Sequence, residues 1–185
     1  DLQVGSDTSS AGGWTVAASL SGLGIGTYTY HAMARDNFGV ASNIVSTTNA
    51  ITDQAAPTAS LTPIATITTA GNSPLDFTVT YSDNLAVDVS DIDASDLTVT
   101  APGGGSLSVS LQSISSSTDG TPRSATYRLS APGGSWGAED NGTYTINMQN
   151  GQVSDTSGNF VAAGSLGSFA VNIAAAPTQV TLRPV

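Results

Sequence analysis

The chain has 185 residues and a formal net charge of −10, made up of thirteen Asp, one Glu and four Arg, with no Lys. This balance argues against a nucleic-acid partner and against an anionic membrane surface, since both need clustered Lys and Arg. No cysteine is present, which excludes disulfides and thiolate metal ligands. No run of about 18 apolar residues is available to insert into a membrane.

The composition and the first quarter of the chain favour strands over helices. Asp, Gly, Ser and Thr are abundant, whereas Glu and Lys, which favour helices, are almost absent. Short alternating runs at 14–20, 27–34 and 41–48 predict three strands. A linker is expected at 53–57, where Asp53 and two alanines precede a proline.

Seven further strands are expected beyond the linker. From Leu75 to Tyr81 every second residue is apolar or aromatic and the residues between are polar, which is typical of a half-buried strand. Gly-rich turns at 101–105 and 131–134 separate neighbouring runs. Seven short strands at this spacing predict an all-β, immunoglobulin-like sandwich. The predicted strands are 59–68, 75–81, 97–100, 107–114, 124–129, 144–148 and 169–173.

A short motif occurs twice, which indicates a tandem array of one module. Gly-Thr-Tyr-Thr stands at 26–29 and again at 142–145, and each copy is followed by an Asp and then a Gly. In each copy the tyrosine, Tyr28 or Tyr144, comes at the start of the sixth strand of its module. We expect both to form tyrosine corners, in which the hydroxyl bonds back to the preceding loop.

Several stretches together resemble the bacterial immunoglobulin-like and cadherin-like tandem repeats of large extracellular, adhesin-type proteins. In the later part of the chain they are FTVTYSDNLAVDVSDIDASDLTVTAPGG, TPRSATYRLSAPGGSWGAEDNGTYTI and VSDTSGN, and in the earlier part GSDTSSAGGW and GTYTYHAMARDNFGVAS. The resemblance implies a secreted or cell-surface location and four segments. These are the C-terminal half of an immunoglobulin-like repeat at 1–52, a linker at 53–57, a complete repeat at 58–174, and at 175–185 a linker or the first strand of a following repeat.

The highest density of candidate metal-ligating residues is in an acidic loop, with five Asp among the fourteen residues 83–96. Ca²⁺ takes six to eight oxygen ligands, which carboxylates and Asn carbonyls supply. In an immunoglobulin-like sandwich this loop shares one end with two later loops and the linker, so a Ca²⁺ site is predicted there. The alternative is a solvated loop with Asp in local turns. The candidate ligands are Asp53, Asp83, Asn84, Asp88, Asp91, Asp93, Asp96 and Asp155.

Catalytic patterns are weak. His31 is the only histidine and falls within a predicted strand, and zinc normally needs more His or Cys ligands than this. No Gly-x-Ser-x-Gly elbow is present, and the adjacent Glu139 and Asp140 diverge, unlike the paired carboxylates of a glycosidase. The sequence therefore predicts a protein that is not an enzyme.

The expected function is that of a structural or adhesion module, a Ca²⁺-stiffened spacer whose partners are neighbouring repeats or adjacent subunits. One alternative is an accessory carbohydrate-binding module of a secreted polysaccharide-active enzyme, with Trp136 and Tyr127 as exposed aromatics for surface glycans. Another is a filament subunit completed by a strand from a neighbour, since a half-sandwich leaves an open edge.

Overall fold

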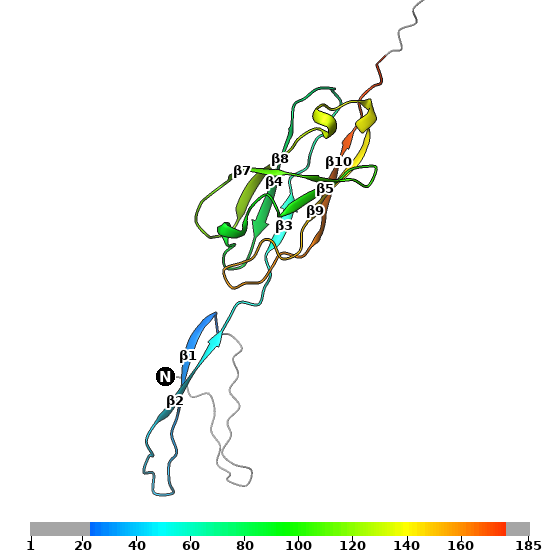
Figure 1. Cartoon of the computed structure of the whole chain (residues 1–185). Helices are drawn as coiled ribbons and strands as arrows, with labels where there is room; N and C mark the ends of the chain where they lie inside the picture. The colour runs from blue at the N-terminus through cyan, green and yellow to red at the C-terminus, as the bar shows by residue number, and fades with distance from the viewer. Residues whose placement is uncertain (1–22, 177–185) are drawn as a thin grey trace, which may run out of the picture. The chain divides into compact units, whose positions relative to one another are not determined.

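The structure, a computed structural model, describes residues 23–176, which divide into two compact units between Asp53 and Gln54 (Figure 1). The described part of the first unit holds an antiparallel hairpin of β1 (Gly26–Ala32) and β2 (Val45–Ile51). Both strands lie close to their predicted places. The strand predicted at 14–20 lies outside the described residues.

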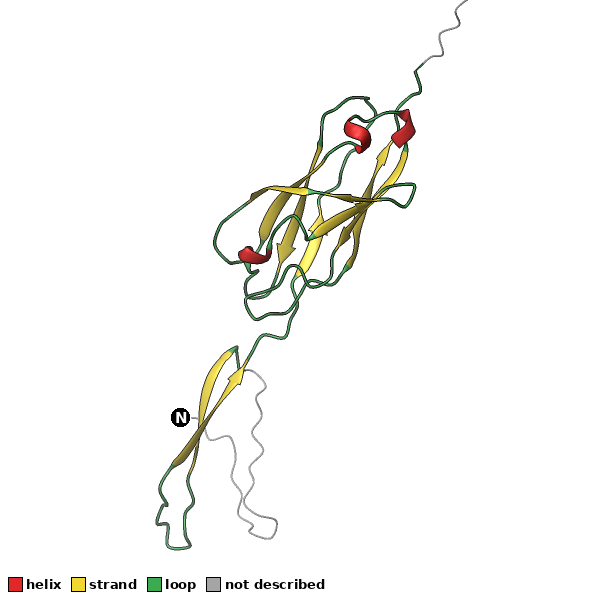
Figure 2. Ribbon diagram, viewed as in Figure 1, coloured by secondary structure: helices red, strands yellow, loops and turns green. Residues whose placement is uncertain are grey.

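The second unit holds two antiparallel four-stranded sheets, so the predicted all-β class is confirmed (Figure 2). One sheet has the order β3-β4-β8-β7 and the other β10-β9-β5-β6. Three one-turn 3₁₀ helices, η1 (Val89–Asp91), η2 (Pro132–Gly134) and η3 (Ala138–Asp140), lie in the connections. The strands are β3 (Thr58–Leu61), β4 (Leu75–Ser82), β5 (Leu97–Thr100), β6 (Ser106–Ser108), β7 (Ser110–Ile114), β8 (Arg123–Leu129), β9 (Gly142–Met148) and β10 (Gly164–Val171).

A single core joins the two sheets, built from the alternating residues of their facing sides. In β4 the buried residues are Phe77, Val79 and Tyr81, as the alternation predicted. Aromatic rings dominate the other sheet, where Tyr144 and Phe169 stack with their centroids 5.0 Å apart. Trp136 meets both rings edge-on. These large buried rings hold the sheets together, because each removes extensive apolar surface from water.

The single strand predicted at 107–114 is wrong, because the chain changes sheet within it. β6 pairs with β5 in one sheet, and β7 pairs with β8 in the other. Val109, between them, is buried in the common core. The uninterrupted alternation of Leu107, Val109 and Leu111 predicts which side chains are buried but not which strand each segment pairs with. The local sequence therefore does not indicate where the chain passes from one sheet to the other.

The opening strand of the second unit is shorter than the predicted 59–68. β3 pairs with β4 as far as Leu61, and Pro63 then lacks the N–H that a ladder needs. Further on, Ile67 bridges in parallel to Val171 of β10. The amide of Ile67 donates to the carbonyl of Ala170 at 2.9 Å. This one segment therefore contributes to the edges of both sheets.

A candidate cation site at the acidic end of the second unit

Three loops meet at one end of the second unit, as the sequence predicted. They follow β4, β7 and β9, and Val87 in the first bridges to Gly120 in the second and to Asp155 in the third. The amide of Asp88 also donates to the carbonyl of Ser154 at 3.0 Å. These backbone contacts hold the acidic loop in a defined position, so its carboxylates have defined surroundings.

Asp83 opens the first of these loops and has one satisfied carboxyl oxygen. Its Oδ2 accepts hydrogen bonds from the amides of Leu85 at 2.7 Å and Ala86 at 3.1 Å. Its own amide donates to Thr121 Oγ1 at 2.9 Å, which ties the loop to its neighbour. Its Oδ1 is buried and accepts no hydrogen bond from the part of the chain that the structure describes. A buried carboxylate oxygen in that state needs a donor or a cation.

Asp155 lies in the third loop, is only 1% exposed, and is held by its own turn. Its Oδ1 accepts from the amides of Ser157 at 2.8 Å and Asn159 at 2.9 Å, and its Oδ2 from Asn159 Nδ2 at 2.7 Å. Burial raises the pKa of this carboxyl, but the hydrogen bonds from Asn159, Ser157 and Gly158 together outweigh burial and lower the pKa below its usual value. Asp155 is therefore ionised at neutral pH.

Asp83 and Asp155 form a group with the linker residue Asp53, which directly precedes the second unit. Each offers a carboxyl oxygen, and the three oxygens lie within 4.8 Å of one another. Ionised carboxylates at this spacing repel one another. The sequence has no Lys and four Arg against fourteen acidic residues. A divalent cation with oxygen ligands fits this set of donors.

The other aspartates predicted as ligands in the loop accept hydrogen bonds away from this group. Asp88 Oδ1 caps η1 by accepting from the amide and hydroxyl of Ser90, and Asp93 Oδ1 accepts in the same way from Ser95. Asp91 Oδ2 accepts from Ser154. None of these carboxylates belongs to the group of three, nor does Asp96 or the exposed Asn84. The interpretation of Asp in local turns is therefore correct for Asp88 and Asp93.

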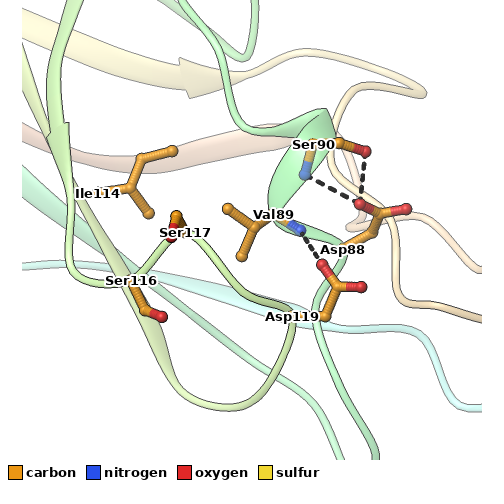
Figure 3. A pocket seen from close by; sticks show the side chains of 7 residues that line it. All are labelled: Asp88, Val89, Ser90, Ile114, Ser116, Ser117 and Asp119. Atoms are coloured by element: carbon orange, nitrogen blue, oxygen red, sulfur yellow. Dashed lines mark hydrogen bonds between the residues drawn. The ribbon is translucent and has the colours of Figure 1, made fainter.

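A shallow hollow of about 570 Å³ lies beside η1 (Figure 3). Asp88 and Asp119 stand on it, and Asp119 Oδ1 accepts from the amide of Val89 at 3.0 Å. The rest of its lining is Val89, Ile114 and three serines.

The two aromatics predicted as a sugar-binding surface are both buried, and that expectation is corrected. Trp136 is 3% exposed and its Nε1 donates to the carbonyl of Ser73 at 3.1 Å. Backbone bonds between Trp136 and Gly71 fold the Gly-rich loop inward. Tyr127 is fully buried and its hydroxyl donates to Asp96 at 2.6 Å. Neither ring offers a face to a glycan.

Sequence reasoning missed the partner of Asp96, because the contact joins residues 31 positions apart. It also missed the short Asp-x-Ser pattern at 88–90 and 93–95, which could have identified the two capping aspartates. His31, the sole histidine, lies exposed in β1.

Comparison with known proteins gives little. No family model and no curated protein matches the chain. Among solved structures, the N-terminal part of the bacterial S-layer protein SbsC is similar at 20% sequence identity and a TM-score of 0.38. The match covers 63% of this chain and 23% of that one. Within residues 23–176 no helix is long and apolar enough to cross a membrane.

Proposed function

We propose that the chain is a non-catalytic structural module of an extracellular protein, in which an immunoglobulin-like repeat binds Ca²⁺ at its acidic end. The observation that carries the proposal is the group of Asp53, Asp83 and Asp155, whose oxygens lie within 4.8 Å of one another. The buried Oδ1 of Asp83 supports a cation there, since no hydrogen-bond donor from the described residues reaches it.

The strand order supports an immunoglobulin-like repeat. Named A to G in chain order, with C′ for β6, the sheets are A-B-E-D and G-F-C-C′, the two-sheet arrangement of that fold. The Tyr144 hydroxyl donates to the carbonyl of Asp140, four residues earlier, at 3.0 Å. This is the contact of a tyrosine corner at the start of strand F.

The first unit supports a tandem array. The Tyr28 hydroxyl donates to the carbonyl of Gly24 at 2.8 Å, which repeats the Tyr144 contact with the same spacing. Both tyrosines belong to the first strand of an antiparallel hairpin. Modules repeated in this way serve to extend and space the parts of a longer protein.

Ca²⁺ would act through linkage, because the folded loops assemble the carboxylates and an unfolded chain does not. A ligand that binds only the folded state stabilises it, by about 2.7 kcal/mol at a free concentration one hundred times the dissociation constant. The cation would also bring together the linker carboxylate and the two loop carboxylates, and so stiffen the start of the repeat.

The test is calorimetric unfolding of the full chain in EGTA and then in excess Ca²⁺, with direct titration by isothermal calorimetry. We expect Ca²⁺ to raise the unfolding temperature of the second unit. Asp83→Asn keeps the size of the side chain and should abolish most of that rise. Asp93→Asn, in the same loop but outside the group, should retain it. A wild-type protein that neither binds Ca²⁺ nor shifts its transition would overturn the proposal.

A further inference from the structure

The core of the second unit contains a buried chain of polar side chains, Asp96, Tyr127 and Tyr81. Asp96 is 0% exposed and directly precedes β5. Its Oδ2 accepts hydrogen bonds from the Tyr127 hydroxyl at 2.6 Å and from the amide of Asp93 at 3.0 Å. The Tyr127 hydroxyl lies 2.8 Å from the Tyr81 hydroxyl. Tyr127 and Tyr81 belong to β8 and β4 of one sheet, whereas Asp96 precedes β5 of the other, so the hydrogen bond between Tyr127 and Asp96 connects the two sheets.

The other oxygen of Asp96 makes this arrangement costly when the carboxyl is ionised. Oδ1 is buried and accepts no hydrogen bond from any residue within 23–176. An ionised oxygen without water or a donor is strongly disfavoured, whereas a protonated carboxyl in the same place is neutral. Protonation of Asp96 therefore removes the free-energy cost of burying its ionised carboxylate.

The groups around Asp96 supply no compensating positive charge. From its own loop the carboxylates of Asp91 and Asp93 face it, and from the opposite sheet the neutral hydroxyls of Tyr81 and Tyr127. The end of β9 contributes Met148, and Gln149 follows it; neither carries a charge. Burial raises the pKa of Asp96 to about 6, against the opposing effect of the hydrogen bonds from Tyr127 and Asp93.

We propose that Asp96, Tyr127 and Tyr81 form a proton-dependent clamp between the two sheets, which tightens the second unit as the surroundings acidify from neutral to about pH 5. The carboxylate of the clamp lies outside the group of three acidic ligands. A module of this kind would be more resistant to unfolding in a mildly acidic medium than in a neutral one.

The direction follows from proton binding. Because the pKa of Asp96 is raised in the folded state, the folded chain binds more protons than the unfolded chain between about pH 4 and 6. Stability from this group is fully present below the unfolded value and is lost as the pH rises through the folded value. The carboxyls of Asp76 and Asp155 have lowered pKa values, so their contributions instead disappear at more acidic pH.

The experiment measures Asp96 directly and then its consequence, with the full chain in EGTA throughout. A carbon-13 NMR titration of the Asp96 carboxyl should show a midpoint near 6. Calorimetric unfolding should place the transition of the second unit higher at about pH 5 than at about pH 7.5. Asp96→Asn should remove that difference, and Asp76→Asn, on the exposed face of β4, should leave it in place.

The Tyr127→Phe variant tests whether the Tyr127 hydroxyl influences the titration of Asp96 or only contributes to packing. Its hydroxyl favours the ionised carboxyl, so its removal should raise the NMR midpoint of Asp96 further. A wild-type midpoint near 4, or a second-unit transition no higher at about pH 5 than at about pH 7.5, would overturn the proposal. If Asp96→Asn does not fold, the wild-type NMR midpoint decides alone.

Discussion

The same turn occurs in both units and shows how much a short motif determines. In the first unit Asp36 Oδ1 accepts from the amides two and four residues on, at 2.9 and 2.8 Å. In the second unit Asp155 Oδ1 does the same, at 2.8 and 2.9 Å. In each turn the glycine three residues on, Gly39 or Gly158, donates its amide to the aspartate carbonyl. The local hydrogen bonds are thus nearly identical.

The surroundings of the two turns differ completely. Asp155 and Tyr144 are each 1% exposed, whereas Asp36 is exposed and Tyr28 only half-buried. β9 lies between β10 and β5, while β1 pairs with β2 alone in the described part of the first unit. Short motifs therefore set the geometry of a turn, and burial sets how much the turn contributes to stability.

The largest expected contrast comes from removing the two aspartates, in EGTA. Asp155→Ala should destabilise the second unit, because three donors lose a charged acceptor in a buried place, and we expect this loss to exceed the relief of repulsion from Asp53 and Asp83. Asp36→Ala should have a much smaller effect, since water replaces the carboxylate. Urea unfolding measures the first, and amide hydrogen exchange at Phe38 and Val40 the second. Equal effects in both units would contradict the role given to burial.

The tyrosine corners should show an intermediate contrast. Tyr144→Phe removes a hydroxyl that donates to the carbonyl of Asp140 within the folded unit, and should cost about 1.5 kcal/mol. Tyr28→Phe removes the matching contact with Gly24 where water has access, and should cost less. Urea unfolding and hydrogen exchange of β1 and β2 provide the comparison. A larger loss from Tyr28→Phe would show that the first unit is better packed than its exposure indicates.

The smallest contrast is expected at the two glycines, where the cost is local. Gly39 and Gly158 have φ values of 82° and 86°, and an added Cβ would meet no atom within 4 Å at either. Gly39→Ala and Gly158→Ala should therefore each cost about 1 kcal/mol, from backbone strain alone. Urea unfolding measures the cost in the second unit, and amide hydrogen exchange measures it in the first. A Gly158→Ala cost several times the Gly39→Ala cost would mean that burial constrains the backbone as well as the side chains.

Much of the fold was predictable from periodicity, and the candidate site was predictable only in part. The strands β4, β5, β8 and β9 follow their alternating patterns closely, because each pairs and packs along its whole length. Of the eight predicted ligands, Asp53, Asp83 and Asp155 form a group. Clustering in sequence does not distinguish an aspartate that caps its own turn from one that faces another loop.

By itself the sequence determined what short-range chemistry decides: the all-β class, the paired tyrosine corners and the Asp-to-Gly turns. Those features depend on residues within about five positions, so local hydrogen bonding specifies them. Only the tertiary structure decided that the chain changes sheet at Val109, that Trp136 turns inward, and that Asp96 meets Tyr127. Each of these depends on contacts between distant strands, where packing around the common core selects one arrangement among several that the local pattern permits.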